Sequence, residues 1–168
     1  MQQKLHVRKI ERMIISDEEI SGIGNVDEDH TIAIVGCFPF CKVGNFTYPE
    51  GDICLKYGKQ DNKNLHRGFG LLHLIKGAHT EDEIYKDVKT IDELVVVLKR
   101  TIKKHSKIFM EREGNFIVIS NGNAKVVLEY RDSETMYSVV TCHNISNTYN
   151  VAKHGDSVGK IKKDLTNV

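Results

Sequence analysis

His73 and His79 are the residues of this sequence whose type and spacing best suit acid–base chemistry. An imidazole has an unperturbed pKa near neutrality, so two of them can supply a general base and a general acid. Side chains six residues apart on one continuous helix lie about 240° from each other. The two histidines can therefore act on one substrate only if the helix ends between them. Gly77 predicts such an end, because glycine is the usual left-handed stop of a helix.

The segment that must position these histidines predicts a strand followed by a short helix. Asp52–Tyr57 alternates apolar and other side chains, as a strand does, and Gly58 ends it. A polar loop follows, and an apolar helix begins at about Phe69 and ends near Gly77. Thr80–Glu83 has the form of a capping box and predicts a further short helical turn.

Two other elements are predicted with clear boundaries. Thr31–Gly36 is continuous and β-branched, which is typical of a buried strand. The residues Thr90-Ile91-Asp92-Glu93 form a second capping box, which opens a helix that runs to about His105. The buried stripe of this helix is predicted to consist of Leu94, Val95, Leu98 and Ile102.

The apolar period then changes to two, which indicates strands. Asn115–Ser120 and Asn123–Arg131 flank Asn121-Gly122, a strong hairpin signal, and Met136–His143 follows as a third strand. The predicted fold class is α+β, with N-terminal helices followed by a twisted antiparallel β-meander. We expect a polar N-terminal arm over 1–30, one domain over 31–151 and a basic, loosely ordered tail over 152–168. Within the arm, Lys4–Met13 is a possible short helix.

The register of the last two predicted strands stays open. If 132–135 is a four-residue turn, Arg131 pairs with Met136, and Tyr130 shares a face with Thr141. A turn of three or five residues places Arg131 and Thr141 together instead, because a slip of one residue exchanges the two faces of a strand.

Charge and composition narrow the classes of function. Residues 1–50 carry 5 Lys/Arg and 8 Asp/Glu (−3), and residues 51–168 carry 19 and 15 (+4), which together give +1. A mildly basic C-terminal part is compatible with an RNA substrate, although a dedicated nucleic-acid binder is far more basic. No apolar run approaches the roughly 20 residues that cross a bilayer, and the N-terminus lacks the apolar core of a signal peptide. We therefore expect no membrane contact and action in a cytoplasm.

No metal or cofactor is expected from the sequence. The four cysteines form no CxxC pair and are predicted to be buried, reduced thiols: Cys37, Cys41, Cys54 and Cys142. Gly68 and Gly70 lack the lysine and the spacing of a phosphate-binding loop, so close packing between strand and helix explains them better.

Residues 55–79, LKYGKQ…GFGLLHLIKGAH, resemble the LKxGK…GFGxxHI…H signature of toxin nucleases in the barnase/EndoU/colicin/RelE superfamily. The resemblance covers about residues 52–143. The sequence departs from the signature at Leu74, where isoleucine is usual, and in a longer polar insertion between Lys59 and Gly68. The resemblance implies a barnase-like fold. It also implies a metal-independent endoribonuclease toxin that cleaves RNA, with tRNA expected, to a 2′,3′-cyclic phosphate and a 5′-OH.

The resemblance also implies roles for individual residues. His73 would be the principal catalytic histidine and His79 the second, in an acid–base order that stays open. Arg131 would bind phosphate, and the Thr141 hydroxyl would support the scissile phosphate. Further candidate RNA contacts are Lys56, Lys76 and His143. Each has a plainer interpretation: His73 as a hydrogen-bonded core histidine, Arg131 as a solvated strand end, and Thr141 as an ordinary strand residue.

The implied partners are RNA and a cognate immunity protein, and the chain is expected to be a monomer that acts in the cytoplasm of a target bacterium. The alternative is a non-catalytic binding module, such as a phage accessory or RNA-binding protein, on the same scaffold.

Overall fold

The structure is a computed structural model that describes residues 12–120, 124–146 and 149–165. Its helices are α1 (Asp17–Ser21), α2 (Gly70–Lys76) and α3 (Ile91–Thr101). Single 3-10 turns are η1 (Glu83–Tyr85), η2 (Asp132–Glu134) and η3 (Val151–His154). The strands are β1 (Thr31–Phe38), β2 (Cys41–Val43), β3 (Phe46–Tyr48), β4 (Gly51–Lys56), β5 (Lys59–Gln60), β6 (Gly68–Phe69), β7 (Lys107–Arg112), β8 (Asn115–Ile119), β9 (Ala124–Arg131), β10 (Met136–Asn144) and β11 (Gly159–Lys160).

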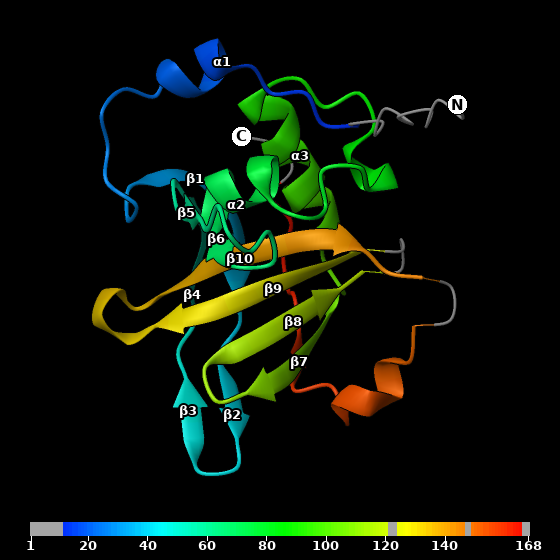
Figure 1. The fold of residues 1–168 in the computed structure, drawn as a ribbon. Coiled ribbons are helices and arrows are strands. Elements are labelled where there is room, and N and C mark those ends of the chain that lie inside the picture. Colours follow the sequence, from blue (N-terminus) through cyan, green and yellow to red (C-terminus); the bar gives the residue numbers. More distant parts are fainter. Residues whose placement is uncertain (1–11, 121–123, 147–148, 166–168) are drawn as a thin grey trace.

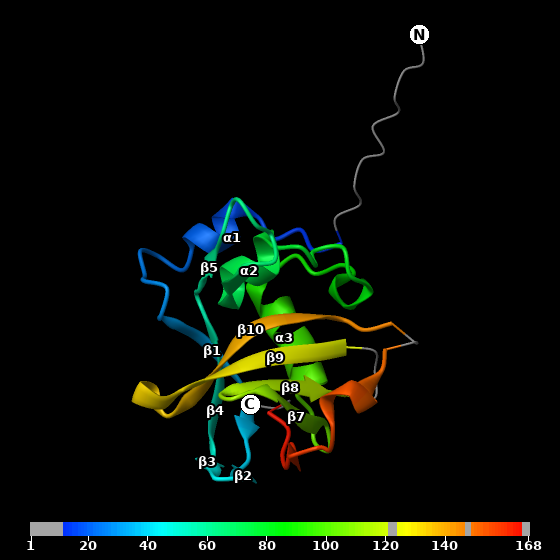
Figure 2. The same ribbon diagram turned by 60° about the horizontal axis from the view of Figure 1, so that its bottom comes forward.

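A seven-stranded sheet in the order β1-β4-β10-β9-β8-β7-β11 forms the body of the molecule (Figure 1). Its neighbouring strands run antiparallel except β4 and β10, which pair in parallel. The hairpins β2–β3 and β5–β6 lie outside this sheet. Figure 2 shows α3 behind the sheet, with α2 and β5 beyond the β10 edge of the meander.

The expected α+β class is consistent with this architecture. Strands β1 and β4 precede α2 and α3, as the strand predictions over 31–36 and 52–57 require, but β4 inserts beside β10, so the sheet extends beyond the predicted meander. β1 lies at a sheet edge, and Ile34 on it is 47% exposed, so the strand is less buried than its continuous apolar sequence predicts. An edge strand has a neighbour on one side only, which leaves part of its apolar surface in water.

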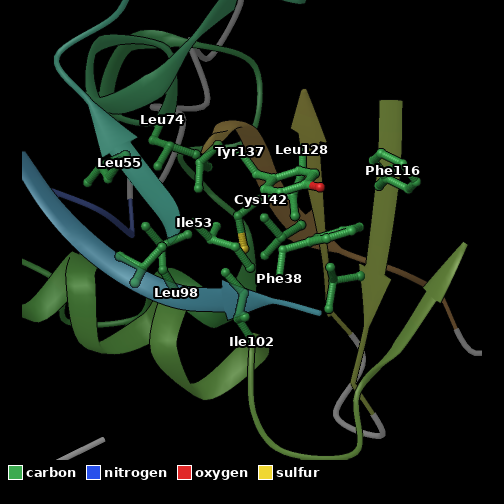
Figure 3. Packing of buried hydrophobic residues seen from close by; sticks show 14 of the residues in the cluster. Phe38, Ile53, Leu55, Leu74, Leu98, Ile102, Phe116, Leu128, Tyr137 and Cys142 are labelled. Carbon is green, nitrogen blue, oxygen red and sulfur yellow. The ribbon is translucent and has the colours of Figure 1, made fainter. Parts of the chain in front are cut away.

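The helix α3 covers one face of the sheet and forms the core with it. Thr90 caps it as predicted, because its side chain accepts a hydrogen bond from the Glu93 backbone N–H. The helix ends at Thr101, not at His105. Ile102 leaves the helical conformation (φ −92°, ψ 62°), and its side chain is fully buried close to Gly36 of β1. Figure 3 shows Leu98 and Ile102 beside the aromatic pair Phe38 and Tyr137 in this core.

The opposite face of the sheet, called the outer face below, carries the polar side chains. Along β9, Ala124, Val126 and Leu128 are buried on the core side. The alternate residues of β9 point to the outer face and are partly buried: Lys125, Val127, Glu129 and Arg131. Helix α2 packs against β10 at one end of this region.

A bulge in β10 settles the register that the sequence left open. Arg131 pairs with Met136, as a four-residue turn requires, but the register shifts between Val139 and Thr141. The extra residue, Val140, exchanges the two faces beyond it. Thr141 pairs with Val127 and therefore shares the outer face with Arg131.

The predicted N-terminal arm over 1–30 and the predicted tail over 152–168 both contribute residues to the core. Met13 is buried and forms a parallel bridge with Val88. Strand β11 pairs with β7, and Ile161 just beyond it is buried, so the sheet reaches into the predicted tail. The predicted helix Lys4–Met13 falls almost entirely outside the described residues. Among the described residues, no helix is long and apolar enough to cross a membrane.

Candidate functional site

Helix α2 holds the first predicted histidine, His73, in a closed slot. The side chain is only 5% exposed. A Cβ added at Gly68 would lie 2.9 Å from His73 Nδ1, and one added at Gly77 would lie 3.0 Å from the same atom. The two glycines therefore make room for the imidazole ring. α2 ends at Lys76 as expected, but Gly77 has φ −84° and is not left-handed. Its role is to avoid a clash with His73.

Gln60 fixes which ring nitrogen of His73 carries the proton. Its amide nitrogen donates to the carbonyl oxygens of Asp61 (2.8 Å) and Asn64 (3.2 Å), so its Oε1 is the atom that faces His73 Nδ1 at 2.6 Å. An amide oxygen only accepts, so Nδ1 donates and Nε2 is unprotonated. Burial is the main cause that lowers the pKa of His73, with the nearby His79 and His66 contributing.

The segment that follows α2 is anchored to the end of β10. Asp82 Oδ2 accepts from the Asn144 backbone N–H at 2.9 Å, and the Ile84 N–H donates to Asn144 Oδ1 at 2.9 Å. The hydroxyl of fully buried Tyr85 donates to the Cys142 carbonyl oxygen. These bonds hold His79, which precedes them in the chain, above the outer face at the end of β10.

His79 and His143 stack on each other there. Their ring centroids are 4.2 Å apart and the ring planes differ by 12°. His143 is on the outer face because it pairs with Lys125 beyond the β10 bulge. His66, on the exposed loop before β6, lies with its ring centroid 6.2 Å from that of His79. The four residues His66, His73, His79 and His143 are called the histidine cluster below.

Three members of the histidine cluster have Nδ1 beside an acceptor, which is hydrogen-bonded in His73 and His143 and at ion-pair distance in His79. His79 Nδ1 lies 3.4 Å from Asp82 Oδ2, and His143 Nδ1 lies 2.9 Å from the Asn144 carbonyl oxygen. With His73 Nδ1 against Gln60, each ring faces an acceptor through Nδ1. An acceptor at Nδ1 fixes the tautomer, so Nε2 of each ring is the atom left for proton transfer.

Burial lowers the pKa of His143, and the charges of His79 and Lys125 act in the same direction. The hydrogen bond to Asn144 and the Asp82 carboxylate oppose this shift. His143 is therefore neutral at pH 7 and can accept a proton there.

Polar groups continue along the outer face from His143. Thr141 is two residues away on β10, about 6.6 Å along the strand. Lys125 lies opposite His143, and its ammonium donates to the Tyr149 hydroxyl at 3.3 Å. The ammonium of Lys153 lies 4.6 Å from the centroid of the Tyr149 ring. Two lysines around one tyrosine form a basic aromatic patch beside the histidine cluster.

Arg131 lies at the other end of the strand pair. It is six positions from Lys125 on β9, a distance of about 20 Å along the strand. Its guanidinium lies 5.0 Å from the centroid of the Phe69 ring and 3.8 Å from carboxylate oxygens of Asp29 and Glu129. Its Nε is buried without a hydrogen-bond partner. Arg131 thus shares a face with Thr141 but lies about 20 Å along the strands from the level of His143.

The two predicted lysine contacts differ. Lys56 is 1% exposed, and its ammonium donates to Glu134 Oε2 at 2.6 Å and to the Asp29 carbonyl oxygen at 2.9 Å. Its prediction as an RNA contact is wrong for this conformation, because the charge is buried and already paired. Lys76 is exposed at the end of α2.

Sequence reasoning missed Asp82, Lys125 and the combination of His79, Asp82 and His143. One ligand atom from each of these three residues lies within 4.8 Å of the others, an arrangement that can hold a metal ion. The spacing His79-x-x-Asp82 was the available signal. All four cysteines are free, and Cys41, Cys54 and Cys142 are buried.

A scan against models of protein families finds none that matches this chain, and searches of curated proteins and of solved structures also find no match. What the chain does is therefore inferred from its own side chains and from the resemblance of residues 55–79.

Proposed function

We propose that the protein is an endoribonuclease that cleaves RNA by attack of the 2′-OH on the adjacent phosphate, without a metal. The observation that carries the proposal is the shared pattern of the histidines, each with Nδ1 against an acceptor and Nε2 left over. This reaction needs a base at the 2′-oxygen, an acid at the departing 5′-oxygen and donors to the charged phosphorane.

His143 acts as the base in this proposal, since the lowered pKa keeps its ring neutral. His79 acts as the acid, with the Asp82 carboxylate behind it to stabilise the imidazolium. The entering and leaving oxygens of an in-line displacement are a few ångströms apart, comparable with the 4.2 Å between the two rings. A phosphate lying across the Nε2 edges of the stacked pair meets both groups.

His73 takes a positioning role in this proposal, in place of the principal catalytic role that the family resemblance implies. Its ring is nearly closed off from solvent and its Nδ1 is held by Gln60. In this way it ties α2 to the hairpin β5–β6 and to the loop that carries His66.

The phosphate is held by Thr141 and Lys125, which flank His143 on the outer face. The hydroxyl and the ammonium are donors of the kind that stabilise a developing oxyanion. Beyond them, Lys125, Tyr149 and Lys153 offer charge and an aromatic ring to the neighbouring nucleotides. Arg131 binds a phosphate farther along the strand, and tRNA remains the substrate that the resemblance favours.

The test is incubation of the purified protein with total tRNA in EDTA, with analysis of the fragment ends. We expect 2′,3′-cyclic phosphate and 5′-OH ends, and no cleavage of a matched oligonucleotide that lacks the 2′-OH. Intact tRNA, or fragments with 5′-phosphate ends, would contradict the proposal. Cleavage that EDTA abolishes would retain an enzyme but remove the metal-free mechanism.

The setting of a toxin with a cognate immunity protein rests on the sequence resemblance. It is tested by expressing the chain in bacteria with and without the protein encoded directly downstream. Growth arrest that the neighbour relieves is expected. Normal growth in both cases, with the folded protein present, would contradict this setting.

The second candidate is an RNA-binding module without catalysis. The observation that favours it is the patch of Lys125, Tyr149 and Lys153, which provides affinity for RNA without requiring the histidines. It predicts RNA binding that His143→Gln leaves unchanged, together with intact RNA after long incubation.

A further inference from the structure

His79, Asp82 and His143 combine two imidazoles and one carboxylate, a ligand set used for divalent transition metals. Their ligand atoms lie within 4.8 Å of one another. In a tetrahedral zinc site the ligand bonds are about 2.0–2.1 Å, which places neighbouring ligand atoms about 3.4 Å apart. The distances between the ligand atoms must therefore shorten by about an ångström for an ion to bind. The side chain of His79 is 34% exposed, so it has room to make this movement.

The groups around these ligands already have the form of a metal site's outer shell. Metal-binding histidines usually donate their other ring N–H to a backbone carbonyl or a carboxylate. His143 does this through Nδ1, 2.9 Å from the Asn144 carbonyl oxygen. Asp82 Oδ2 accepts from the Asn144 backbone N–H at 2.9 Å, which holds the carboxylate in place. One residue, Asn144, thus orients two of the three ligands.

We propose that His79, Asp82 and His143 form a binding site for one divalent transition-metal ion of the zinc class. Solvent or His66 completes the coordination, because the His66 ring centroid lies 6.2 Å from that of His79 on an exposed loop.

Occupation of this site has a consequence that rests on the function proposed above. A neutral imidazole has a single lone pair, so an ion bound to His79 and His143 takes the lone pair that each ring needs for proton transfer. Zinc would then inhibit the ribonuclease reversibly, and EDTA would activate protein that had been purified with metal. The binding site itself does not depend on the protein being a ribonuclease.

The test is a titration of the metal-free, full-length protein with zinc by calorimetry, repeated with cobalt(II) to record its visible absorption. Asp82→Asn and His143→Gln remove one ligand each, and Asn retains an oxygen that can accept from Asn144. His30→Asn is the matched control, because His30 is exposed and lies outside the histidine cluster. Circular dichroism confirms that each variant is folded before titration.

We expect one zinc ion per chain, at least tenfold weaker binding in both ligand variants, and unchanged binding in His30→Asn. Cobalt should give the intense visible bands of a four-coordinate ion. Absence of saturable binding, or equal affinity in the folded ligand variants and the wild type, would overturn the site. In the cleavage assay, zinc should inhibit at the concentration that half-saturates binding, and full activity of zinc-saturated protein would overturn the inhibitory consequence.

Discussion

The two ends of the outer face of β9 and β10 use their polar groups in opposite ways. At the arginine end, Arg131 lies 3.8 Å from carboxylate oxygens of Asp29 and Glu129, and the buried ammonium of Lys56 pairs with Glu134, so each cation already has a charged partner. At the histidine end, His79 and His143 each have one ring nitrogen against an acceptor and the other available. The outer face thus carries cations with charged partners at one end and histidines with an available ring nitrogen at the other. The arginine end suits stability and phosphate binding, and the histidine end suits proton transfer.

The largest expected effect comes from His143→Gln compared with Arg131→Gln. Loss of the base should lower the single-turnover rate of RNA cleavage by about 10²–10⁴-fold. Loss of Arg131 removes one phosphate contact remote from the reacting atoms, and about a tenfold loss is expected, mainly in RNA affinity. Rates measured with saturating RNA separate the two effects. If both variants lost the same cleavage rate at saturating RNA, or if Arg131→Gln lost more, the histidine end would not be the catalytic end of the outer face.

Gly77→Ala should destabilise the protein by forcing open the slot around His73. An added Cβ would lie 2.4 Å from the His73 carbonyl oxygen and 3.0 Å from its ring, so the slot must open. We expect a loss of about 1–3 kcal/mol in the free energy of unfolding, measured in urea. The control is Gly22→Ala, where φ is −60° and the nearest atom is 3.4 Å away. If Gly77→Ala lowered the free energy of unfolding no more than Gly22→Ala does, the slot around His73 would not be closely packed.

Glu134→Gln tests whether the arginine end is structural. The ammonium of Lys56, which is 1% exposed, loses its charged partner. Because Glu134 is 41% exposed, solvent screening reduces the resulting loss of stability. A loss of about 1–2 kcal/mol in unfolding free energy is expected, with the cleavage rate of the folded protein unchanged. Glu113→Gln, an exposed carboxylate elsewhere, should change stability by under about 0.5 kcal/mol. A fall in rate without a fall in stability would assign this end to catalysis.

The smallest expected effect is a pH dependence of stability that His73 contributes. Burial lowers the pKa of His73 in the folded protein from its ordinary value of 6.5. Below pH 6.5 the imidazole therefore binds a proton more readily in the unfolded chain than in the folded protein. The contribution of His73 is complete above pH 6.5 and is lost as pH falls through the lowered folded pKa. In His73→Gln, unfolding free energy should decline less steeply on acidification than in the wild type. Identical slopes would show that His73 is not buried as a neutral ring.

Local sequence signals predicted several of the elements, whereas the strands β2, β3, β5, β6, β7 and β11 were not predicted. The Thr90–Glu93 capping box, the strand before α2 and the last three meander strands all lie close to their expected positions. These elements depend on short-range chemistry, such as side-chain capping and alternation of apolar residues. The insertion of β4 beside β10 depends on pairing between residues about 80 apart, for which the sequence has no local signal.

The candidate site also combines features with a local sequence signal and features that depend on contacts between distant residues. His79 was recognised by its type and by the Gly77 break, whereas its stacking on His143 depends on the fold of the whole meander. The bulge at Val140 decided which face Thr141 and His143 occupy, and nothing in the sequence MYSVVTCH marks the extra residue. Lys56 was misassigned because its burial depends on Glu134, which lies 78 residues away.

The central claim, that the stacked pair His79 and His143 transfers the two protons, is tested most directly with a sulfur substitution in the substrate. An oligoribonucleotide that spans a cleaved bond is made with sulfur in place of the departing 5′-oxygen, so that departure no longer needs an acid. The account predicts that this substrate restores cleavage by His79→Ala nearly to the wild-type rate and does not restore cleavage by His143→Gln. Equal failure of His79→Ala on both substrates would contradict the assignment of His79 as the acid.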